Sequence, residues 1–340
     1  MKKFFAILLC AIMVIAVVAC DTGAKEADYK LGMGVVVSMD SSKDGLAQVD
    51  ATVATVVTDA DGKIVACRID VAQNKFTPGT DKADKKFETK MELGSRYGME
   101  GKVDNDGNGV KLEWDAQAKA FETWVVGKTA AQVEATELQE AGGHMIATDK
   151  DLLDAGCSMQ ITDFIAAVVK ACNDEQGMAF KTAGTITLGV AAKTTAAETT
   201  AETVKMYTDF AAAAIVDGKI VAALNDAIQP NITVDAEGKI VEKAFKATKR
   251  ELKEGYNMSP AVNFGMDPNG DGVVKEWYLQ SAAFSGHVVG MTATEVAGMK
   301  TEANSIGYQM TTDADLLAAG CTIQITAIIA VMAQAANNAR

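Results

Sequence analysis

The segment Asp151-Leu-Leu-Asp-Ala-Gly-Cys-Ser-Met-Gln-Ile-Thr162 returns later in the chain as Asp315-Leu-Leu-Ala-Ala-Gly-Cys-Thr-Ile-Gln-Ile-Thr326. Other landmarks return in the same order, so that Asp61-Gly-Lys-Ile-Val65 is answered by Asp217-Gly-Lys-Ile-Val221. Self-similarity over so long a segment is typical of a duplicated domain and not of a short-period solenoid. The repeat therefore predicts two homologous tandem domains in one chain.

Each copy carries the pattern of an antiparallel sheet followed by helices. In the first copy, residues 31–40 and 48–58 alternate apolar and polar side chains as strands do, and Asp61-Gly62 is a hairpin signal before a third strand. Residues 113–126 carry apolar side chains at helical spacing, and residues 162–172 form a closing helix. The predicted fold class is α+β, each domain being an antiparallel sheet with packed helices.

The domain boundaries follow from the extent of the repeat. We expect a first domain over residues 29–175, a second over residues 180–340, and an interdomain linker within 173–181. Thr129 with Gln132, and Thr292 with Glu295, fit the capping box that begins a helix in each copy.

The N-terminus has the organisation of a bacterial signal peptide. Two lysines precede an uncharged run that ends at residue 19, which is short for crossing about 30 Å of hydrocarbon. The run closes on Val17-Val18-Ala19-Cys20, which resembles the lipobox of bacterial lipoproteins. The resemblance implies a signal peptide over residues 1–19, a lipid on Cys20 and a tether over residues 20–28. The alternative is an ordinary secretory signal with an incidental cysteine.

Composition narrows the class of protein. The 340-residue chain has a formal net charge of −13 and is 49% hydrophobic, which is ample for buried cores. An acidic protein repels nucleic acid, so no nucleic-acid partner is expected. Four cysteines beyond the lipobox are too few for a disulfide scaffold, and free buried thiols are favoured over bridges. They are Cys67, Cys157, Cys172 and Cys321.

A late glycine motif is the first candidate site. Ala155-Gly156-Cys157-Ser158, and Ala319-Gly320-Cys321-Thr322 in the second copy, each precede an apolar helix. The motif and the plan of each copy resemble the FMN-binding domain of exported flavoproteins and electron-transfer lipoproteins. That resemblance implies FMN attached through a phosphoester to Ser158 and Thr322, with its phosphate held by backbone N–H groups near Gly156 and Gly320. The sequence departs from the family motif, since Ala replaces its Ser and Cys replaces its Ala. The alternative is a plain turn with small buried residues.

An acidic loop in each copy is the second candidate site. Asp104-Asn-Asp-Gly-Asn-Gly-Val-Lys-Leu-Glu113 and Asp267-Pro-Asn-Gly-Asp-Gly-Val-Val-Lys-Glu276 resemble the first half of an EF-hand loop, which binds Ca2+ through oxygen ligands. The usual glutamate at the twelfth position is missing, and a plain Asx-rich turn is the alternative. The candidate ligands are Asp104, Asp106, Asn108, Glu113, Asp267, Asn269, Asp271 and Glu276.

These observations give two expectations of function. The first is an extracytoplasmic lipoprotein, lipid-anchored at the cell surface or the periplasmic face of a membrane, that carries FMN in electron transfer and meets a membrane redox protein. The second is a non-catalytic ligand- or partner-binding lipoprotein that has lost the flavin. An enzyme with its own substrate is disfavoured because His144 is answered by Tyr308, so no Cys/His pair is repeated.

Overall fold

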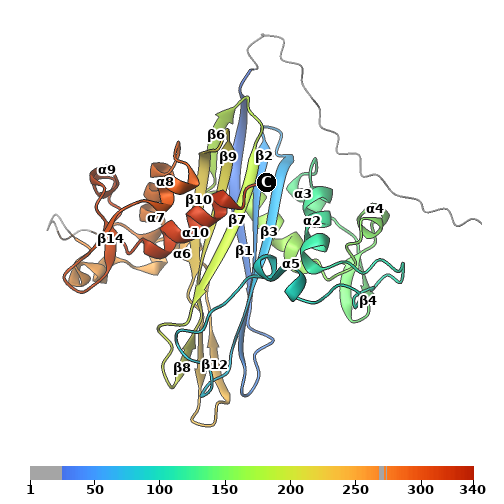
Figure 1. Ribbon diagram of the computed structural model, residues 1–340, viewed down its shortest axis with the longest axis horizontal. Coiled ribbons are helices and arrows are strands. Elements are labelled where there is room, and N and C mark those ends of the chain that lie inside the picture. The colour runs from blue at the N-terminus through green and yellow to red at the C-terminus, as the bar shows by residue number, and fades with distance from the viewer. Residues whose placement is uncertain (1–24, 268–271, 273) are drawn as a thin grey trace, which may run out of the picture.

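Two antiparallel sheets lie face to face at the centre of the molecule, and helices cover the outer face of each sheet (Figure 1). The computed structural model describes residues 25–267, 272 and 274–340. We call residues 25–182 the first half and residues 183–340 the second half. The predicted α+β class is confirmed, and the layers run helix, sheet, sheet, helix.

The first sheet has the strand order β3-β2-β1-β6. Its strands are β1 (Ala27–Ser38), β2 (Ala47–Asp59), β3 (Ile64–Phe76) and β6 (Met178–Thr182). The three strands expected from alternation are all present and are longer than predicted. β6 overlaps the segment expected to be a linker, and it pairs with β1 so that Tyr29 lies opposite Phe180. Part of that segment is therefore the fourth strand of the first sheet.

The second sheet has the order β10-β9-β7. Its strands are β7 (Thr187–Thr195), β9 (Tyr207–Val216) and β10 (Lys219–Ile228). A further sheet, seen at the lower end of Figure 1, consists of β8 (Thr203–Lys205), β11 (Asn231–Val234) and β12 (Ile240–Ala244). Each half also has a two-stranded hairpin. These hairpins pair β4 (Leu138–Ala141) with β5 (His144–Ala147), and β13 (Thr301–Ala303) with β14 (Gln309–Thr311).

The helices follow the same order in both halves. The first half has α1 (Lys90–Leu93), the 3-10 turn η1 (Gly94–Arg96), α2 (Trp114–Trp124), α3 (Ala130–Glu134), α4 (Lys150–Asp154) and α5 (Thr162–Cys172). The second half has α6 (Lys249–Leu252), η2 (Lys253–Tyr256), η3 (Ser259–Phe264), α7 (Trp277–His287), α8 (Ala293–Ala297), α9 (Ala314–Ala318) and α10 (Thr326–Asn337). Both predicted capping boxes are confirmed, at the starts of α3 and α8.

Strand alternation builds three adjoining cores. On β2, Val53 and Val57 face the other sheet, whereas Ala54 and Val56 face the helices of the first half. On β9, Phe210 faces the inter-sheet core and Ala211 faces the helices of the second half. Both faces of these strands are therefore buried. Antiparallel sheets more commonly have one buried face and one face exposed to solvent. The halves share one apolar layer.

The closing helices lie unusually close to the sheets. A Cβ added to Gly32 on β1 would overlap the carbonyl oxygen of Ala171 on α5, and a Cβ added to Gly189 on β7 would overlap that of Ala335 on α10. Only glycine fits at these two crossings.

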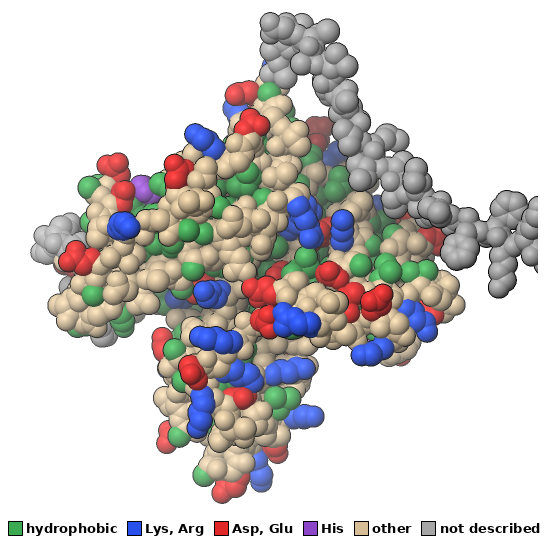
Figure 2. Space-filling model, in the orientation of Figure 1, with side chains coloured by type: hydrophobic (Ala, Val, Ile, Leu, Met, Phe, Trp, Pro, Cys, Tyr) green, Lys and Arg blue, Asp and Glu red, His purple; other side chains and the backbone are tan. Residues whose placement is uncertain are grey.

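Acidic and basic side chains are interspersed on the face seen in Figure 2. Among the described residues, no helix has the length and apolar character needed to cross a bilayer. Cys20 and the predicted signal peptide lie outside the described residues.

Candidate functional site

The glycines of the predicted flavin motif terminate short helices. Gly156 has φ +88° and its N–H donates to the Leu153 carbonyl at 2.8 Å, just after α4. Gly320 has φ +82° and donates to the Leu317 carbonyl at 2.8 Å, just after α9. A glycine in the left-handed region after a helix is the common C-terminal signal. The motif glycines thus serve as helix stops in both halves.

The two hydroxyls expected to carry FMN are buried. Ser158 is 1% exposed and its backbone N–H donates to Oε1 of Gln117 at 3.0 Å. Thr322 is 7% exposed, and its N–H donates to Oε1 of Gln280 at 2.6 Å while its hydroxyl donates to the carbonyl of Met266 at 2.6 Å. A phosphate would reach either hydroxyl only if this packing opened.

The neighbouring thiols are inert. Cys157 and Cys321 are fully buried, and burial raises the pKa of each thiol to about 12. The thiolate is the reactive form of cysteine, so neither residue is activated as a nucleophile. The four cysteines expected to be free are free in the structure.

The acidic loops lie directly over the glycine motifs. In the first half, the side-chain amide of Asn105 donates to the carbonyl of Ser158 at 2.8 Å. In the second half, the Thr322 hydroxyl reaches the residue just before Asp267. The structure therefore brings together the two candidate sites that the sequence left separate, and the loops help to bury the motif hydroxyls.

Part of the acidic loop is arranged like the start of a calcium loop. The N–H of Gly109 donates to Oδ2 of Asp104 at 3.1 Å, and the N–H of Gly272 donates to Oδ2 of Asp267 at 2.8 Å. The opposite oxygens, Oδ1 of Asp104, Asp106 and Asp267, are buried and have no hydrogen-bond partner among the described residues. The described part of the chain contains no group of three or more His, Cys, Asp or Glu side chains placed to hold a metal.

The other candidate calcium ligands either form hydrogen bonds within the protein or lie outside the described residues. The side-chain amide of Asn108 donates to Oδ2 of Asp106 at 2.7 Å. Asn269 and Asp271 lie outside the described residues. Glu113 and Glu276 instead bind the preceding turn, as Glu113 accepts the N–H of Met99 at 3.0 Å and Glu276 accepts the N–H of Met258 at 3.0 Å.

The pKa of Glu113 reflects this arrangement. Burial raises it, but hydrogen bonds from the backbone N–H groups of Trp114, Met99 and Glu100 outweigh burial and leave the pKa below its usual value. Backbone N–H groups therefore hold the Glu113 carboxylate in its ionised form.

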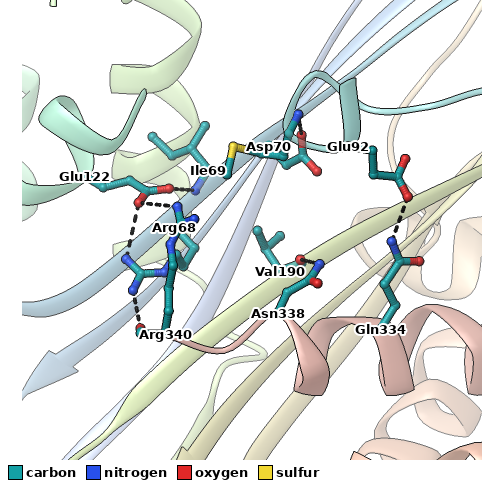
Figure 3. A pocket seen from close by; sticks show the side chains of 10 residues that line it. Arg68, Ile69, Asp70, Glu92, Glu122, Val190, Gln334, Asn338 and Arg340 are labelled. Atoms are coloured by element: carbon teal, nitrogen blue, oxygen red, sulfur yellow. Dashed lines mark hydrogen bonds and ion pairs between the residues drawn. The ribbon is translucent and has the colours of Figure 1, made fainter. Parts of the chain in front are cut away.

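A cavity of about 250 Å³ lies where the two halves meet (Figure 3). The first half contributes β3, α1 and α2, and the second half contributes β7, α10 and Arg340. Sequence reasoning did not find this cavity, because its walls come from segments that are far apart in the chain.

Cations collect at one end of the cavity. The carboxylate of Glu122, whose side chain is 1% exposed, pairs with Arg68 and Arg340 at 3.2 Å each and accepts the N–H of Ile69 at 2.8 Å. Burial raises the pKa of Glu122, and the two guanidinium groups partly oppose that effect. Arg68 also donates to the carbonyls of Cys67 and Arg340, while its Nε is buried without a partner in the described structure. Two guanidinium groups thus share one carboxylate.

Carboxylates collect at the other end. Asp70 is 3% exposed, and its Oδ1 accepts the N–H groups of Val71 at 2.7 Å and Met91 at 3.2 Å. Burial raises the pKa of Asp70 to about 6, although hydrogen bonds from its neighbours oppose the shift. Glu92 accepts the side-chain amide of Gln334 at 2.7 Å. Neither carboxylate forms an ion pair with any described residue.

The second half has a counterpart of this acidic end. Asp226 accepts the N–H groups of Ala227 at 2.8 Å and Arg250 at 3.0 Å, just as Asp70 accepts those of Val71 and Met91. It borders a cavity of about 290 Å³ that is also formed by both halves.

At the counterpart the protein supplies the cations. Arg250 takes the place of Met91 in the repeated Thr-Lys-x-Glu-Leu segment, and its guanidinium pairs with Asp174 at 3.1 Å. Lys170 pairs with Glu251, which corresponds to Glu92. One sequence signal that distinguishes the two cavities is therefore the change from methionine to arginine at this position.

In comparisons with known proteins, no family model, no curated protein and no solved structure matches the chain. The fold and the site define its class by themselves. It is a four-layer α+β protein in which two similar halves share an apolar layer and enclose a charged cavity.

Proposed function

We propose that the protein is an extracytoplasmic, lipid-anchored binding protein that holds a small ligand in the cavity between its halves and performs no chemistry on it. The observation that carries the proposal is that Asp70 and Glu92 lack the cations which Arg250 and Lys170 supply at the counterpart cavity. Asp70 is buried whereas Glu92 is exposed, and burying a carboxylate such as that of Asp70 without a cation costs stability. Such an arrangement is expected where a ligand completes the site.

The location rests on the N-terminal sequence. The lipobox at residues 17–20 supports cleavage before Cys20 and an anchor made of acyl chains, with the membrane as partner. The net charge of −13 argues against nucleic acid as a partner.

The flavin carrier is the rival proposal. Against it stand the burial of Ser158 and the hydrogen bond from the Thr322 hydroxyl to Met266, because a phosphoester needs both hydroxyls accessible. The raised pKa values of Cys157 and Cys321 likewise argue against an enzyme with a cysteine nucleophile.

One preparation tests both proposals. The full chain is expressed with its own signal segment in a bacterial host, purified from membranes in mild detergent, and studied by visible absorbance, peptide mass mapping and native mass spectrometry. We expect a colourless protein with a diacylglyceryl group on Cys20 and a bound small molecule that Glu92→Gln releases.

The matched variants sharpen the test. Cys20→Ser should leave the protein out of the membrane fraction without changing the bound molecule. FMN covalently attached at Ser158 or Thr322 would overturn the binding proposal in favour of the flavin carrier. A preparation in which no small molecule binds, before or after denaturation and refolding with a metabolite extract, would refute it as well.

A further inference from the structure

The two ends of the cavity have opposite charge, and we infer from this that its ligand is a zwitterion of the size of a free α-amino acid, with its carboxylate at Arg68 and Arg340 and its ammonium at Asp70 and Glu92. The inference rests on the proposed binding function and names the ligand class for the same cavity. Figure 3 shows Arg68, Arg340 and Glu122 together on one side and Asp70 and Glu92 on the other.

The basic end of the cavity can bind an anion. Arg68 and Arg340 together carry two positive charges, and Glu122 is the one described side chain that neutralises them, while Arg68 also donates to the main-chain oxygen of Arg340. A guanidinium offers five N–H donors in a planar fork that matches a carboxylate. Arg340 uses this fork on Glu122 alone among the described side chains, and the Arg340 side chain is 42% exposed. A ligand carboxylate would satisfy these donors.

The acidic end of the cavity can bind a cation. Every hydrogen-bond partner of the Asp70 and Glu92 carboxylates is neutral, being a backbone N–H, a hydroxyl or the Gln334 amide. An ammonium group carries three donors and one positive charge. It would therefore supply the charge that this end lacks.

The counterpart cavity indicates that a positive charge is missing beside Asp70. The pKa of Asp226 is raised by burial but lowered by the nearby Arg250 guanidinium, whereas no cation acts on Asp70. The methionine at position 91 cannot replace that guanidinium. A ligand ammonium in the first cavity would take the electrostatic role that the Arg250 side chain plays in the second.

The size and the walls of the cavity favour a small ligand. Drug-sized ligands occupy pockets of roughly 300–1,000 Å³, and this cavity of about 250 Å³ lies below that range. Ile69, Met91 and Val190 are the apolar residues among those that line the cavity. A single amino acid with a non-polar side chain fits this description better than a peptide.

Isothermal titration calorimetry of the full chain tests the ligand class. Bound material is first removed by unfolding in urea and refolding, and the protein is then titrated with each of the twenty common amino acids. We expect saturable binding of at least one. For that amino acid, the N-acetyl derivative, which lacks the ammonium, and the amide, which lacks the carboxylate, should each bind at least tenfold more weakly.

Three variants test the position. Glu92→Gln removes a charge but keeps the capping box, as Gln132 does at the start of α3, and should weaken binding at least tenfold. Glu251→Gln makes the same change at the counterpart cavity and should leave affinity unchanged. The double variant Met91→Arg with Asn338→Asp copies the Arg250–Asp174 pair into the first cavity. It should abolish ligand binding, while its melting temperature should be no lower than that of the parent.

The results separate the ligand class from the proposed function. If no amino acid binds, or the single-charge derivatives bind as tightly, the zwitterion inference is wrong. The binding function still stands in that case if native mass spectrometry finds another small molecule that Met91→Arg with Asn338→Asp excludes. Tighter binding of a dipeptide than of either free amino acid would overturn the size assignment. Equal weakening by Glu251→Gln would overturn the choice of cavity.

Discussion

Arg250 and Asp174 form an ion pair across the boundary between the halves, with 3.1 Å between Nη2 and Oδ2 and side chains 7% and 9% exposed. Asp174 also accepts the N–H of Met33, so it joins the end of the first half to β1 and to α6 of the second half. The equivalent places at the other cavity hold Met91 and Asn338. One protein thus contains a charged and a neutral version of the same contact.

The first prediction concerns this ion pair. Breaking a buried pair by removing one partner costs about 3–5 kcal/mol, since the other charge stays buried and unpaired. Arg250→Met should therefore lower the free energy of unfolding in urea by about that amount. The double variant Arg250→Met with Asp174→Asn should recover most of the loss, because it copies the neutral pair found at the other cavity. A double variant no more stable than the single one would contradict this account.

The second prediction concerns the close helix crossings. Gly189→Ala forces the Cβ against the backbone of α10 and should lower the free energy of unfolding by at least about 2 kcal/mol, as overpacking does. Gly286 in α7 has open space around its Cα and an ordinary backbone conformation. Gly286→Ala should instead raise stability by about 0.5–1 kcal/mol, from helix propensity. Equal effects of the two substitutions would argue against the tight crossing.

The third prediction is a pH dependence at Asp70. Its folded-state pKa of about 6 lies above the unfolded value, so the protonated form stabilises the fold. That contribution is fully present below the unfolded pKa of roughly 4 and is lost as pH rises through 6, amounting to about 3 kcal/mol.

Asp70→Asn mimics the protonated form and removes this dependence. In the ligand-free protein the variant should match the parent at pH 4 and exceed its free energy of unfolding by about 3 kcal/mol at pH 7.5, as measured by urea unfolding across that range. Asp226→Asn, beside Arg250, should show a smaller gain. A difference between Asp70→Asn and its parent that does not change with pH would refute the assignment.

The fourth prediction concerns calcium. If the orphaned oxygens of Asp104, Asp106 and Asp267 face an ion, Ca2+ binds only the folded state and stabilises it, by about 2.7 kcal/mol at a hundredfold excess over Kd. Scanning calorimetry should then show a higher melting temperature in millimolar Ca2+ than in chelator.

A triple variant is the control for calcium. Replacing the three aspartates by asparagine keeps the hydrogen bonds of the loops and removes their charge, so the calcium response should vanish. An unchanged melting temperature of the parent with Ca2+ would show that these loops are plain turns.

Local patterns in the sequence were sufficient for most of the secondary structure. The first three strands, the hairpin at Asp61-Gly62, the capping boxes and the closing helices each depend on residues close together in the chain, where periodicity and cap chemistry act. Alanine-rich β9 shows the limit of local patterns. Alanine is the best helix former, yet residues 211–214 are buried on both faces of a central strand, because burial between two packed layers outweighs propensity.

The tertiary structure alone decided how the halves combine and where the candidate site lies. Arg68 meets Glu122 and Arg340 although they lie 54 and 272 residues away, and no local pattern encodes such a meeting. By contrast, the sequence by itself determined the repeat and the acidic charge, and it supplied the resemblance to a lipobox ending at Cys20, since each depends on neighbouring residues or on composition. The shared apolar layer and the charged cavity exist only after folding brings the two sheets face to face, because burial and pairing of charge depend on neighbours in space.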